Sequence, residues 1–366
     1  MAIFQFLAVL LTILATIQTS SSFENESREF ITWNDLTISN SNYTSKAVNQ
    51  AQRGSRMIVV SQDGHGDSNT VQGAIDMVSD GNSERIKILI YPGIYRQVPL
   101  VLFCFELEKV IIPITKPYIS LIGTGQGDTK ITWNSKASDF DSTGNPIGTI
   151  NSATFAVEAD YFCAKEVVFE NSAPAAVPGA KGEQAVALRL SGDKAMLYRS
   201  KILGTQDTLF DNQGRHYFFR CFIQGSIDFI FGNAKSLYQE CTLSVVATSF
   251  GAVAASQRDS PTEDTGFSFV KSRIIGSGLN YLGRAWGRYS RVVYAYCRID
   301  GIVRPDGWYD WDDVSRRSTA YFGEYSCSGA GAELGSKVSW AKSLTYQEAQ
   351  PFMSQGYIDG NEWLML

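Results

Sequence analysis

The sequence lacks any long run of lysine or arginine. It has 366 residues, and its 37 Asp and Glu residues outnumber its 32 Lys and Arg residues, which gives a formal net charge of −5. General nucleic-acid binders and proteins that bind anionic membranes carry concentrated positive charge. The charge balance therefore argues against both kinds of partner. The composition, 44% hydrophobic and 19% charged, is that of a globular protein with enough apolar residues for a core.

Candidate membrane spans are also missing from the chain. The only comparable apolar run, residues 6–17, is followed by a small polar run, which predicts a secretory signal peptide over residues 1–22. This run is short for a membrane span and has no Lys or Arg before it, so a buried N-terminal helix is the alternative. Two Asn-x-Ser/Thr sequons, at Asn25 and Asn42, are compatible with a secreted glycoprotein.

Long helices are not indicated after residue 110, where short β-rich runs alternate with Gly, Asn, Asp and Ser turns. This pattern excludes a doubly wound α/β sheet. Arg199, Gly204, Asp207 and Phe210 are each followed by the same residue type 21 positions later. A period near 20 residues is typical of one coil of a parallel β-solenoid, and a β-sandwich, the alternative, does not explain it. The sequence therefore predicts an all-β solenoid, with a strand and a short amphipathic helix from residue 57 as its cap.

The repeat places two acids, Asp207 and Asp228, on neighbouring coils. Residues one coil apart stack at about 4.8 Å, and two carboxylates that close do not both ionise freely. Gln184 precedes Gln206 by 22 residues, again about one coil, and amides are neutral donors that suit an oxyanion. Two close carboxyl groups and two amide donors are the groups that an acyl-transfer site requires. A polar ladder of Gln and Asp that caps turns is the structural alternative.

Arg284 and Trp286, in the segment YLGRAWG, add two groups that a structural ladder does not need. A guanidinium beside Asp228 would hold that carboxylate ionised and fix its orientation. An indole nearby offers a flat surface for a sugar ring. Cys221 and Cys241 are also about one coil apart, which makes them the best candidates for a disulfide among the six cysteines.

Four segments of the chain resemble, in order and spacing, the signature segments of plant-type pectin methylesterases (pectinesterases). They are QAVAL at 184–188, QDTL at 206–209, IDFIFG at 227–232 and LGRAW at 282–286. The resemblance extends from about Met57 to Leu364 and implies a right-handed, single-stranded parallel β-helix of the pectin-lyase type. It also implies an enzyme of the cell wall that hydrolyses the methyl esters of homogalacturonan (pectin) and releases methanol.

The resemblance implies a role for each residue of the strip. Asp228 would be the nucleophile, and Asp207 would protonate the leaving methanol and then act as base towards water. Gln184 and Gln206 would stabilise the oxyanion, and Arg284 would orient Asp228. No metal or cofactor is implied, the chain is expected to be a monomer, and its expected partners are pectin and a proteinaceous pectinesterase inhibitor. The residues expected to bind substrate are Thr149, Gln184, Phe231, Arg284 and Trp286.

The chain departs from the family pattern at two places. Ala285 stands where the family usually has proline, a difference that changes backbone stiffness but no chemistry. Residues 97–107, QVPLVLFCFEL, interrupt the first signature segment with a nearly uncharged apolar insert. We interpret this insert as the translation of a retained intron or of a wrongly placed exon boundary. If it is a real part of the protein, it predicts an exposed apolar loop distant from the catalytic strip.

The expected organisation is a signal peptide at 1–22, a polar arm at 23–55 and the β-helix domain at 56–366. The arm is too short for the helical inhibitor-like region that often precedes the plant enzymes. Two other functions remain open. A glycosidase or lyase on the same fold would also use paired carboxylates, but it does not call for two Gln donors and an Arg on the nucleophile. A pectin-binding protein with a vestigial site is disfavoured because all five catalytic residue types are present.

Overall fold

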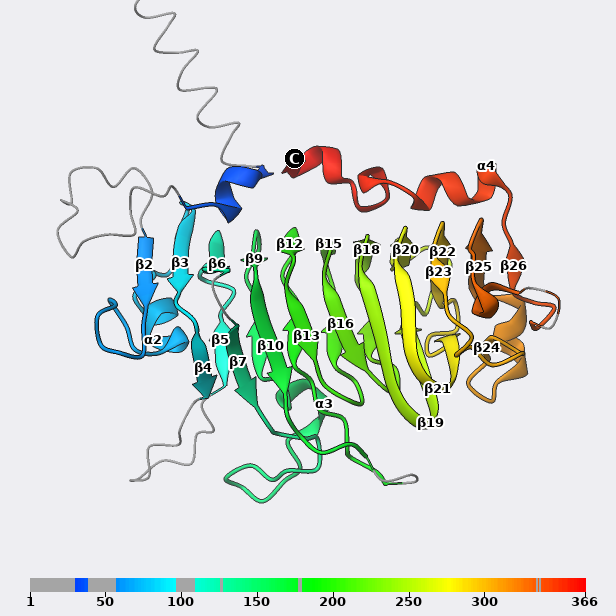
Figure 1. Ribbon diagram of the computed structural model, residues 1–366, viewed down its shortest axis with the longest axis horizontal. Helices are drawn as coiled ribbons and strands as arrows, with labels where there is room; N and C mark the ends of the chain where they lie inside the picture. The colour runs from blue at the N-terminus through cyan, green and yellow to red at the C-terminus, as the bar shows by residue number, and fades with distance from the viewer. Residues whose placement is uncertain are drawn as a thin grey trace, which may run out of the picture.

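The structure is a computed structural model that describes residues 30–38, 57–96, 109–125, 128–176, 180–333, 335 and 337–366. Its strands wind into a right-handed parallel β-helix, in which each coil adds one strand to each face (Figure 1). The predicted fold class is confirmed. The predicted signal peptide, both sequons and the insert at 97–107 lie outside the described residues.

Three faces build the β-helix in the described part of the chain. Sheet 1 contains β2 (Met57–Val60), β3 (Ile86–Ile90), β6 (Ile119–Gly123), β9 (Cys163–Lys165), β12 (Ala195–Tyr198), β15 (Arg215–Phe219), β18 (Lys235–Gln239), β20 (Gly266–Val270), β22 (Arg291–Ala295), β25 (Tyr321–Tyr325) and β26 (Lys342–Ser343). Sheet 2 contains β4 (Gly93–Arg96), β7 (Thr129–Trp133), β10 (Val167–Asn171), β13 (Lys201–Leu203) and β16 (Phe222–Gly225). Sheet 3 contains β5 (Val110–Ile112), β8 (Phe155–Val157), β11 (Leu188–Leu190), β14 (Leu209–Asp211) and β17 (Ile230–Gly232).

Two long strands, β19 (Thr242–Ser256) and β21 (Arg273–Arg284), run through both sheet 2 and sheet 3. The short strands β23 (Arg298–Ile299) and β24 (Trp308–Tyr309) extend these two faces beyond β21. The long strands therefore join sheet 2 and sheet 3 into one continuous sheet in the later coils.

The 21-residue repeat corresponds to the coil itself. Phe210 pairs in register with Phe231, and Tyr198 pairs with Phe219. Arg199 and Arg220 follow that second pair at the same corner of successive coils, with φ of 51° and 54°. The corner therefore requires a left-handed backbone in every coil. Gly225 recurs for a steric reason, because a Cβ atom there would lie 2.1 Å from the Cβ of Phe229.

Stacked aromatic rings fill the interior beneath sheet 1. Phe218, Tyr238, Phe269 and Tyr294 come from four successive strands, and adjacent ring centroids lie 4.4–4.7 Å apart. These side chains are fully buried. In-register parallel strands place like side chains one above another, so a single aromatic position per coil produces a continuous ladder.

The N-terminal end of the β-helix is capped as the sequence predicts. After β2, helix α2 (Val71–Asp76) begins at Thr70, whose side chain accepts a hydrogen bond from the Gly73 N–H. The helix buries Val71, Ala74 and Ile75 against the first coil. The short helices elsewhere are η1 (Trp33–Leu36), α3 (Gly148–Asn151), η4 (Val314–Ser318) and η5 (Ala330–Ala332).

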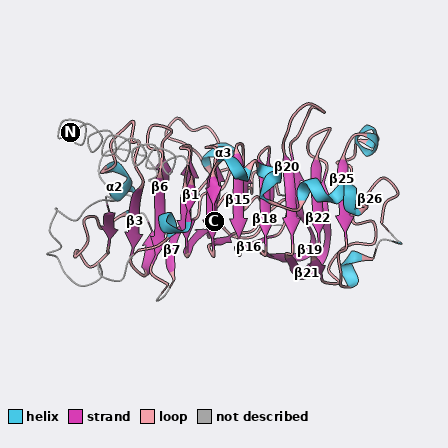
Figure 2. Ribbon diagram, turned by 90° about the horizontal axis from the view of Figure 1, so that it is seen from above, coloured by secondary structure: helices cyan, strands magenta, loops and turns pink. Residues whose placement is uncertain are grey.

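Near its C-terminus the chain turns back and crosses the outer side of sheet 1 (Figures 1 and 2). This strap, residues 346–365, contains α4 (Tyr346–Ala349), η7 (Gln350–Phe352), η8 (Gln355–Ile358), η9 (Gly360–Glu362) and β27 (Leu364–Met365). Strand β27 pairs in parallel with β1 (Ile31–Thr32) from the predicted N-terminal arm. Residues 30–38 and the strap therefore meet on sheet 1, opposite the faces that carry the long strands.

The predicted disulfide is wrong, because Cys221 and Cys241 are free thiols in the structure. They do occupy equivalent positions on adjacent coils, directly before the in-register pair Phe222 and Thr242. In-register residues have parallel Cα–Cβ bonds, so their Cβ atoms stay about 4.8 Å apart, whereas a disulfide brings them to about 3.5–4.5 Å. Cys163, Cys297 and Cys327 are free as well. In the described parts of the chain no helix is long and apolar enough to cross a bilayer.

Candidate active site

A cavity of about 430 Å³ opens on the outer side of sheet 3. Every one of the eight residues predicted for catalysis or substrate binding lines it: Thr149, Gln184, Gln206, Asp207, Asp228, Phe231, Arg284 and Trp286. The volume is within the range of small-molecule and substrate sites. The structure thus brings residues from widely separated parts of the sequence into one cavity.

The two acids lie at the turn that leads into sheet 3, one coil apart. Asp207 comes just before β14 and Asp228 just before β17, and the Asp207 N–H donates to the Ile227 carbonyl across 3.0 Å. Both acids have a left-handed backbone, with φ of 59° and 46°. Asp tolerates this conformation better than most residues, although it remains strained, and such strain is concentrated at functional sites.

Arg284 forms a two-point contact with Asp228. Its Nε donates to Asp228 Oδ1 across 2.7 Å, and its Nη2 donates to Oδ2. Asp228 is only 6% exposed. Burial raises the pKa of Asp228, and the charge and hydrogen bonds of Arg284 act in the opposite direction. A buried carboxylate whose two oxygens are both held by one edge of a guanidinium is best described as the ionised member of the acid pair.

Asp207 has no such two-point contact with a cation, and the neighbouring carboxyl group, Asp228, contributes negative charge. Desolvation raises its pKa well above the ordinary value, and the negative charge of Asp228 raises it further. Arg284 and a hydrogen bond with the Gln206 side chain oppose this shift but do not cancel it. Only Asp228 has a cation bound at both oxygens, so Asp207 is the member of this close pair that is favoured to hold a proton.

Aromatic rings form the floor of the cavity beside the acids. Phe210 and Phe231 stack with centroids 4.4 Å apart and planes inclined by 10°. The ring centroids of Trp286 and Phe231 lie 6.0 Å apart. The Trp311 ring covers the Arg284 guanidinium, whose Cζ lies 4.2 Å from the ring centroid. These rings belong to one apolar cluster with Ala153, Ala156, Val186 and Ala255. The floor offers flat apolar surface next to the reactive groups.

One wall of the cavity comes from helix α3. Thr149 and Ile150 lie in this helix, and Ile150 is 47% exposed. Gln184 comes from the segment before β11, where Ala185 N–H donates to the Gln206 carbonyl across 3.1 Å. Gln184 and Gln206 are thus on adjacent coils, as the 22-residue spacing predicts. In the described part of the chain, no group of three or more His, Cys, Asp or Glu side chains is placed to hold a metal.

Four lining residues were not among the predicted site residues: Ile150, Phe210, Ala255 and Trp311. The sequence could have indicated Phe210, because it is the partner of Phe231 in the 21-residue repeat. It could not have indicated Trp311, since this residue follows β24 in a segment without a repeated counterpart. Ala255 pairs in register with Phe231 and with Arg284, which only the length of β19 reveals.

Comparisons with known proteins agree on one family. The family model described as Pectinesterase matches residues 57–361. Pectinesterase QRT1 of Arabidopsis thaliana is 50% identical over 360 residues, which cover 93% of this chain and 92% of that protein. Probable pectinesterase 8 of the same plant is 42% identical, over 81% of this chain and 73% of its own.

Solved structures give the same result for the fold. The pectin methylesterase from carrot superposes with a TM-score of 0.75 at 34% identity, covering 87% of this chain and 96% of its own. A pectin methylesterase in complex with hexasaccharide VII has a TM-score of 0.69 at 23% identity, over 83% of this chain and 97% of that one. The second likeness concerns the fold alone.

Proposed function

Because the chain belongs to the pectinesterase family and is an ester hydrolase that demethylates pectin, we propose that Asp228 is its nucleophile and Asp207 its general acid and base. The observation that supports this assignment is the asymmetry of the two carboxyls. Arg284 contacts Asp228 at both oxygens, and the pKa of Asp207 is raised by burial and by the neighbouring charge. One group is thus prepared to attack and the other to donate a proton.

In the first half-reaction, a carboxylate oxygen of Asp228 attacks the carbonyl carbon of the methyl ester. Negative charge develops on the carbonyl oxygen, where the side-chain amides of Gln184 and Gln206 donate hydrogen bonds. The bond to the methoxy oxygen then breaks, and Asp207 transfers its proton to that oxygen. Methanol leaves, and the galacturonyl group stays on Asp228 as an acyl anhydride.

In the second half-reaction, Asp207 is a carboxylate and accepts a proton from water. The hydroxyl oxygen attacks the galacturonyl carbonyl carbon, and the bond to the Asp228 oxygen breaks. Asp228 is again a carboxylate and Asp207 is again protonated, so the cycle closes. The products are one methanol and one galacturonic acid group for each ester and water consumed, and the acid group then ionises and releases its proton to solvent.

The charges in the cavity favour the ester over its product. Asp207, Asp228 and Arg284 are the only charged residues that line the cavity in the described structure, and the guanidinium is already paired with Asp228. A neutral methyl ester therefore meets no uncompensated charge, whereas a newly formed galacturonate carboxylate lies close to the Asp228 carboxylate. This repulsion assists product release and disfavours rebinding at the catalytic position.

The polysaccharide would lie along the aromatic floor. Phe231 and Trp286 supply flat surfaces for sugar rings, and Thr149 in α3 contacts the chain from the side. We place the enzyme outside the cell, in the cell wall, after removal of residues 1–22. It would act there as a monomer under the control of a proteinaceous inhibitor of its family.

Incubation with highly methylated pectin tests the reaction. The wild-type protein is expected to release methanol without shortening the polymer, and Asp228→Ala is expected to lose turnover while still binding pectin. New reducing ends or unsaturated products would assign the site to glycosidase or lyase chemistry instead. Methanol release by Asp228→Ala at the wild-type rate would remove Asp228 from the nucleophile role.

A further inference from the structure

Arg284 and Trp286 are both carried by a short loop at the end of β21. This loop, residues 284–288, follows the last ladder pair of β21, Arg284 with Tyr309. On the side of the preceding coil, the Gly287 N–H donates to the Ser256 carbonyl and the Arg288 N–H donates to Asp259. On the other side the loop contacts residues 309–319 of the following coil, which we name the bracket. The bracket consists of the end of β24, a turn and helix η4.

The bracket contacts the loop along its whole length. The Tyr309 carbonyl accepts a hydrogen bond from the Ala285 N–H at 2.9 Å. At the other end, the Thr319 hydroxyl donates to the Arg288 carbonyl. Between these two points lies Arg316 of η4, whose side chain is only 20% exposed.

Arg316 supplies the contact nearest to the two functional residues. Its Nη1 donates to the Ala285 carbonyl and also to the Trp286 carbonyl, the latter across 2.6 Å. Its Nε donates to Asp313, which in turn caps η4 by accepting from the Ser315 N–H. The guanidinium is therefore held by Asp313 at its Nε, and its Nη1 joins two consecutive carbonyls of the loop.

One charged donor that holds the Ala285 and Trp286 carbonyls fixes the two peptide planes on either side of Trp286. Hydrogen bonds from a charged donor are stronger than neutral ones, and a buried carbonyl without a donor is costly. These two planes determine where the Trp286 side chain points and how the preceding Arg284 leaves the strand. Arg316 itself does not line the cavity and touches neither acid.

The bracket also contacts Arg284 from the cavity side. Trp311 lies over the Arg284 guanidinium at 4.2 Å, and Arg284 in turn holds Asp228 at both oxygens. One segment thus supports the backbone of the loop through Arg316 and the side chain of Arg284 through Trp311. A displacement of about 1 Å at a reacting group can reduce the rate about a hundredfold.

We propose that Arg316 is a positioning residue of the esterase: by holding the Ala285 and Trp286 carbonyls, it keeps Arg284 against Asp228 and Trp286 at the sugar surface. This inference rests on the proposed function, in which Arg284 maintains the nucleophile. Arg316 acts through other residues and makes no contact with the reacting atoms.

The test compares Arg316→Gln with Arg317→Gln, a matched control on the same helix. Arg317 pairs with Asp310 and has no hydrogen bond to the loop in the described structure. We expect Arg316→Gln to lower kcat/KM on methylated pectin by roughly tenfold to a hundredfold. We also expect the acid limb of its pH profile to move to higher pH, because a displaced Arg284 no longer favours the ionised form of Asp228. Arg317→Gln should keep the wild-type kcat/KM and the wild-type acid limb. Arg316→Lys, which keeps the positive charge but has a single donor nitrogen, should give values between those of the wild type and Arg316→Gln.

Three outcomes decide the question. Wild-type kcat/KM in Arg316→Gln would overturn the positioning role, and so would a loss of activity without a shift of the acid limb. Should Arg316→Gln fail to fold, the same comparison is made with Arg316→Lys, and a wild-type profile there would overturn the inference. Asp228→Asn is measured in parallel: if it stays active, the proposed function fails, and if it is inactive while Arg316→Gln matches Arg317→Gln, only the positioning role fails.

Discussion

At the scale of single residues, the site depends on two identical side chains with opposite tasks. Asp207 and Asp228 occupy equivalent positions on successive coils and share the same left-handed backbone. What separates them is Arg284, which contacts only Asp228. The β-helix repeat supplies the proximity of the acids, and one guanidinium from a later coil divides proton donor from nucleophile.

The Arg284–Asp228 contact predicts the pH dependence of the enzyme. In Arg284→Lys, an ammonium cannot reproduce the two-point contact, so the carboxylate form of Asp228 is less favoured and its pKa rises. We expect kcat/KM to fall about tenfold or more and its acid limb to move to higher pH. Arg220→Lys, which alters an exposed pair with Glu240, is the control and should leave the profile unchanged. An unshifted acid limb in Arg284→Lys would contradict the assignment.

Trp286 allows substrate binding to be separated from chemistry. Removing its ring in Trp286→Ala takes away a flat surface beside Phe231, and an aromatic contact is worth about 0.5–1.5 kcal/mol. We expect KM for methylated pectin to rise about twofold to tenfold, with a smaller effect on kcat. Trp33→Ala is the control, because Trp33 makes an edge-on contact with Tyr198 on the opposite face of the molecule. A fall in kcat with unchanged KM would argue against a sugar contact.

At the scale of elements, a buried polar group links β14, β15 and β18. Asp211 accepts a hydrogen bond from His216 Nδ1 and from the Tyr238 hydroxyl, each at 2.5 Å. His216 Nε2 donates to the Gly192 carbonyl at 2.8 Å. Both ring nitrogens thus face oxygen atoms, which favours the imidazolium, and Asp211 raises the pKa of His216 against the effect of burial.

This group predicts that stability falls in mildly alkaline solution. A histidine with a raised pKa in the folded state stabilises the fold fully below its unfolded pKa of about 6.5. The contribution is lost as the pH rises through the folded pKa. We expect the Tm of the wild type to decrease above neutral pH, and His216→Gln to have a lower Tm that changes less across the same range. Parallel pH curves for the two proteins in thermal unfolding would exclude this role for His216.

The elements also show what can be predicted from the sequence and why. The coil length and the stacking of Asp207 on Asp228 are visible because each corner demands a left-handed residue and the following strands place Phe210 and Phe231 in register, which gives this part of the chain a period. Trp311 and Arg316 lie in a segment with no counterpart one coil earlier, so no local pattern marks them. The disulfide prediction failed because equal spacing shows which residues stack but not that in-register Cβ atoms stay too far apart.

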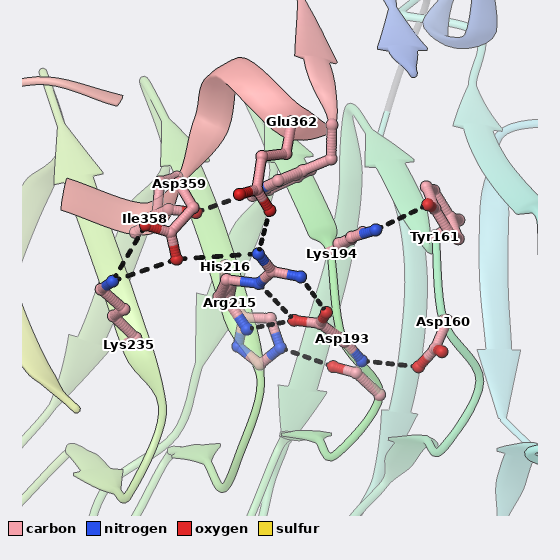
Figure 3. Close-up of polar contacts among 12 residues, drawn as sticks. Asp160, Tyr161, Asp193, Lys194, Arg215, His216, Lys235, Ile358, Asp359 and Glu362 are labelled. Atoms are coloured by element: carbon pink, nitrogen blue, oxygen red, sulfur yellow. Dashed lines mark hydrogen bonds and ion pairs between the residues drawn. The ribbon is translucent and has the colours of Figure 1, made fainter. Parts of the chain in front are cut away.

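At the scale of the whole molecule, the strap and strand β1 cover sheet 1 while the cavity opens on sheet 3. The strap is attached by a network of charges centred on Arg215 (Figure 3). Arg215 pairs with Asp193 of the β-helix at 2.6 Å and with Glu362 of the strap at 2.9 Å. Lys235 adds a contact to Asp359 at 3.1 Å. The contacts that hold the strap and the residues that line the cavity are therefore on different faces of the β-helix, so mutations can change one without the other.

Arg215→Gln tests this separation. The variant leaves Glu362 and Asp193 without their shared cation, so the strap should open more often and its amides should exchange hydrogen faster over residues 354–366. Because these groups are partly exposed and screened, we expect a loss of only about 1 kcal/mol, that is a decrease in Tm of about 2–4 °C, which becomes smaller at high salt. Methanol release should keep its wild-type kcat/KM, since no residue of the network lines the cavity. Arg220→Gln, which removes one exposed pair, is the control for hydrogen exchange. Unchanged exchange in the strap, or a loss of activity at full occupancy of the folded state, would show that the two faces are not independent.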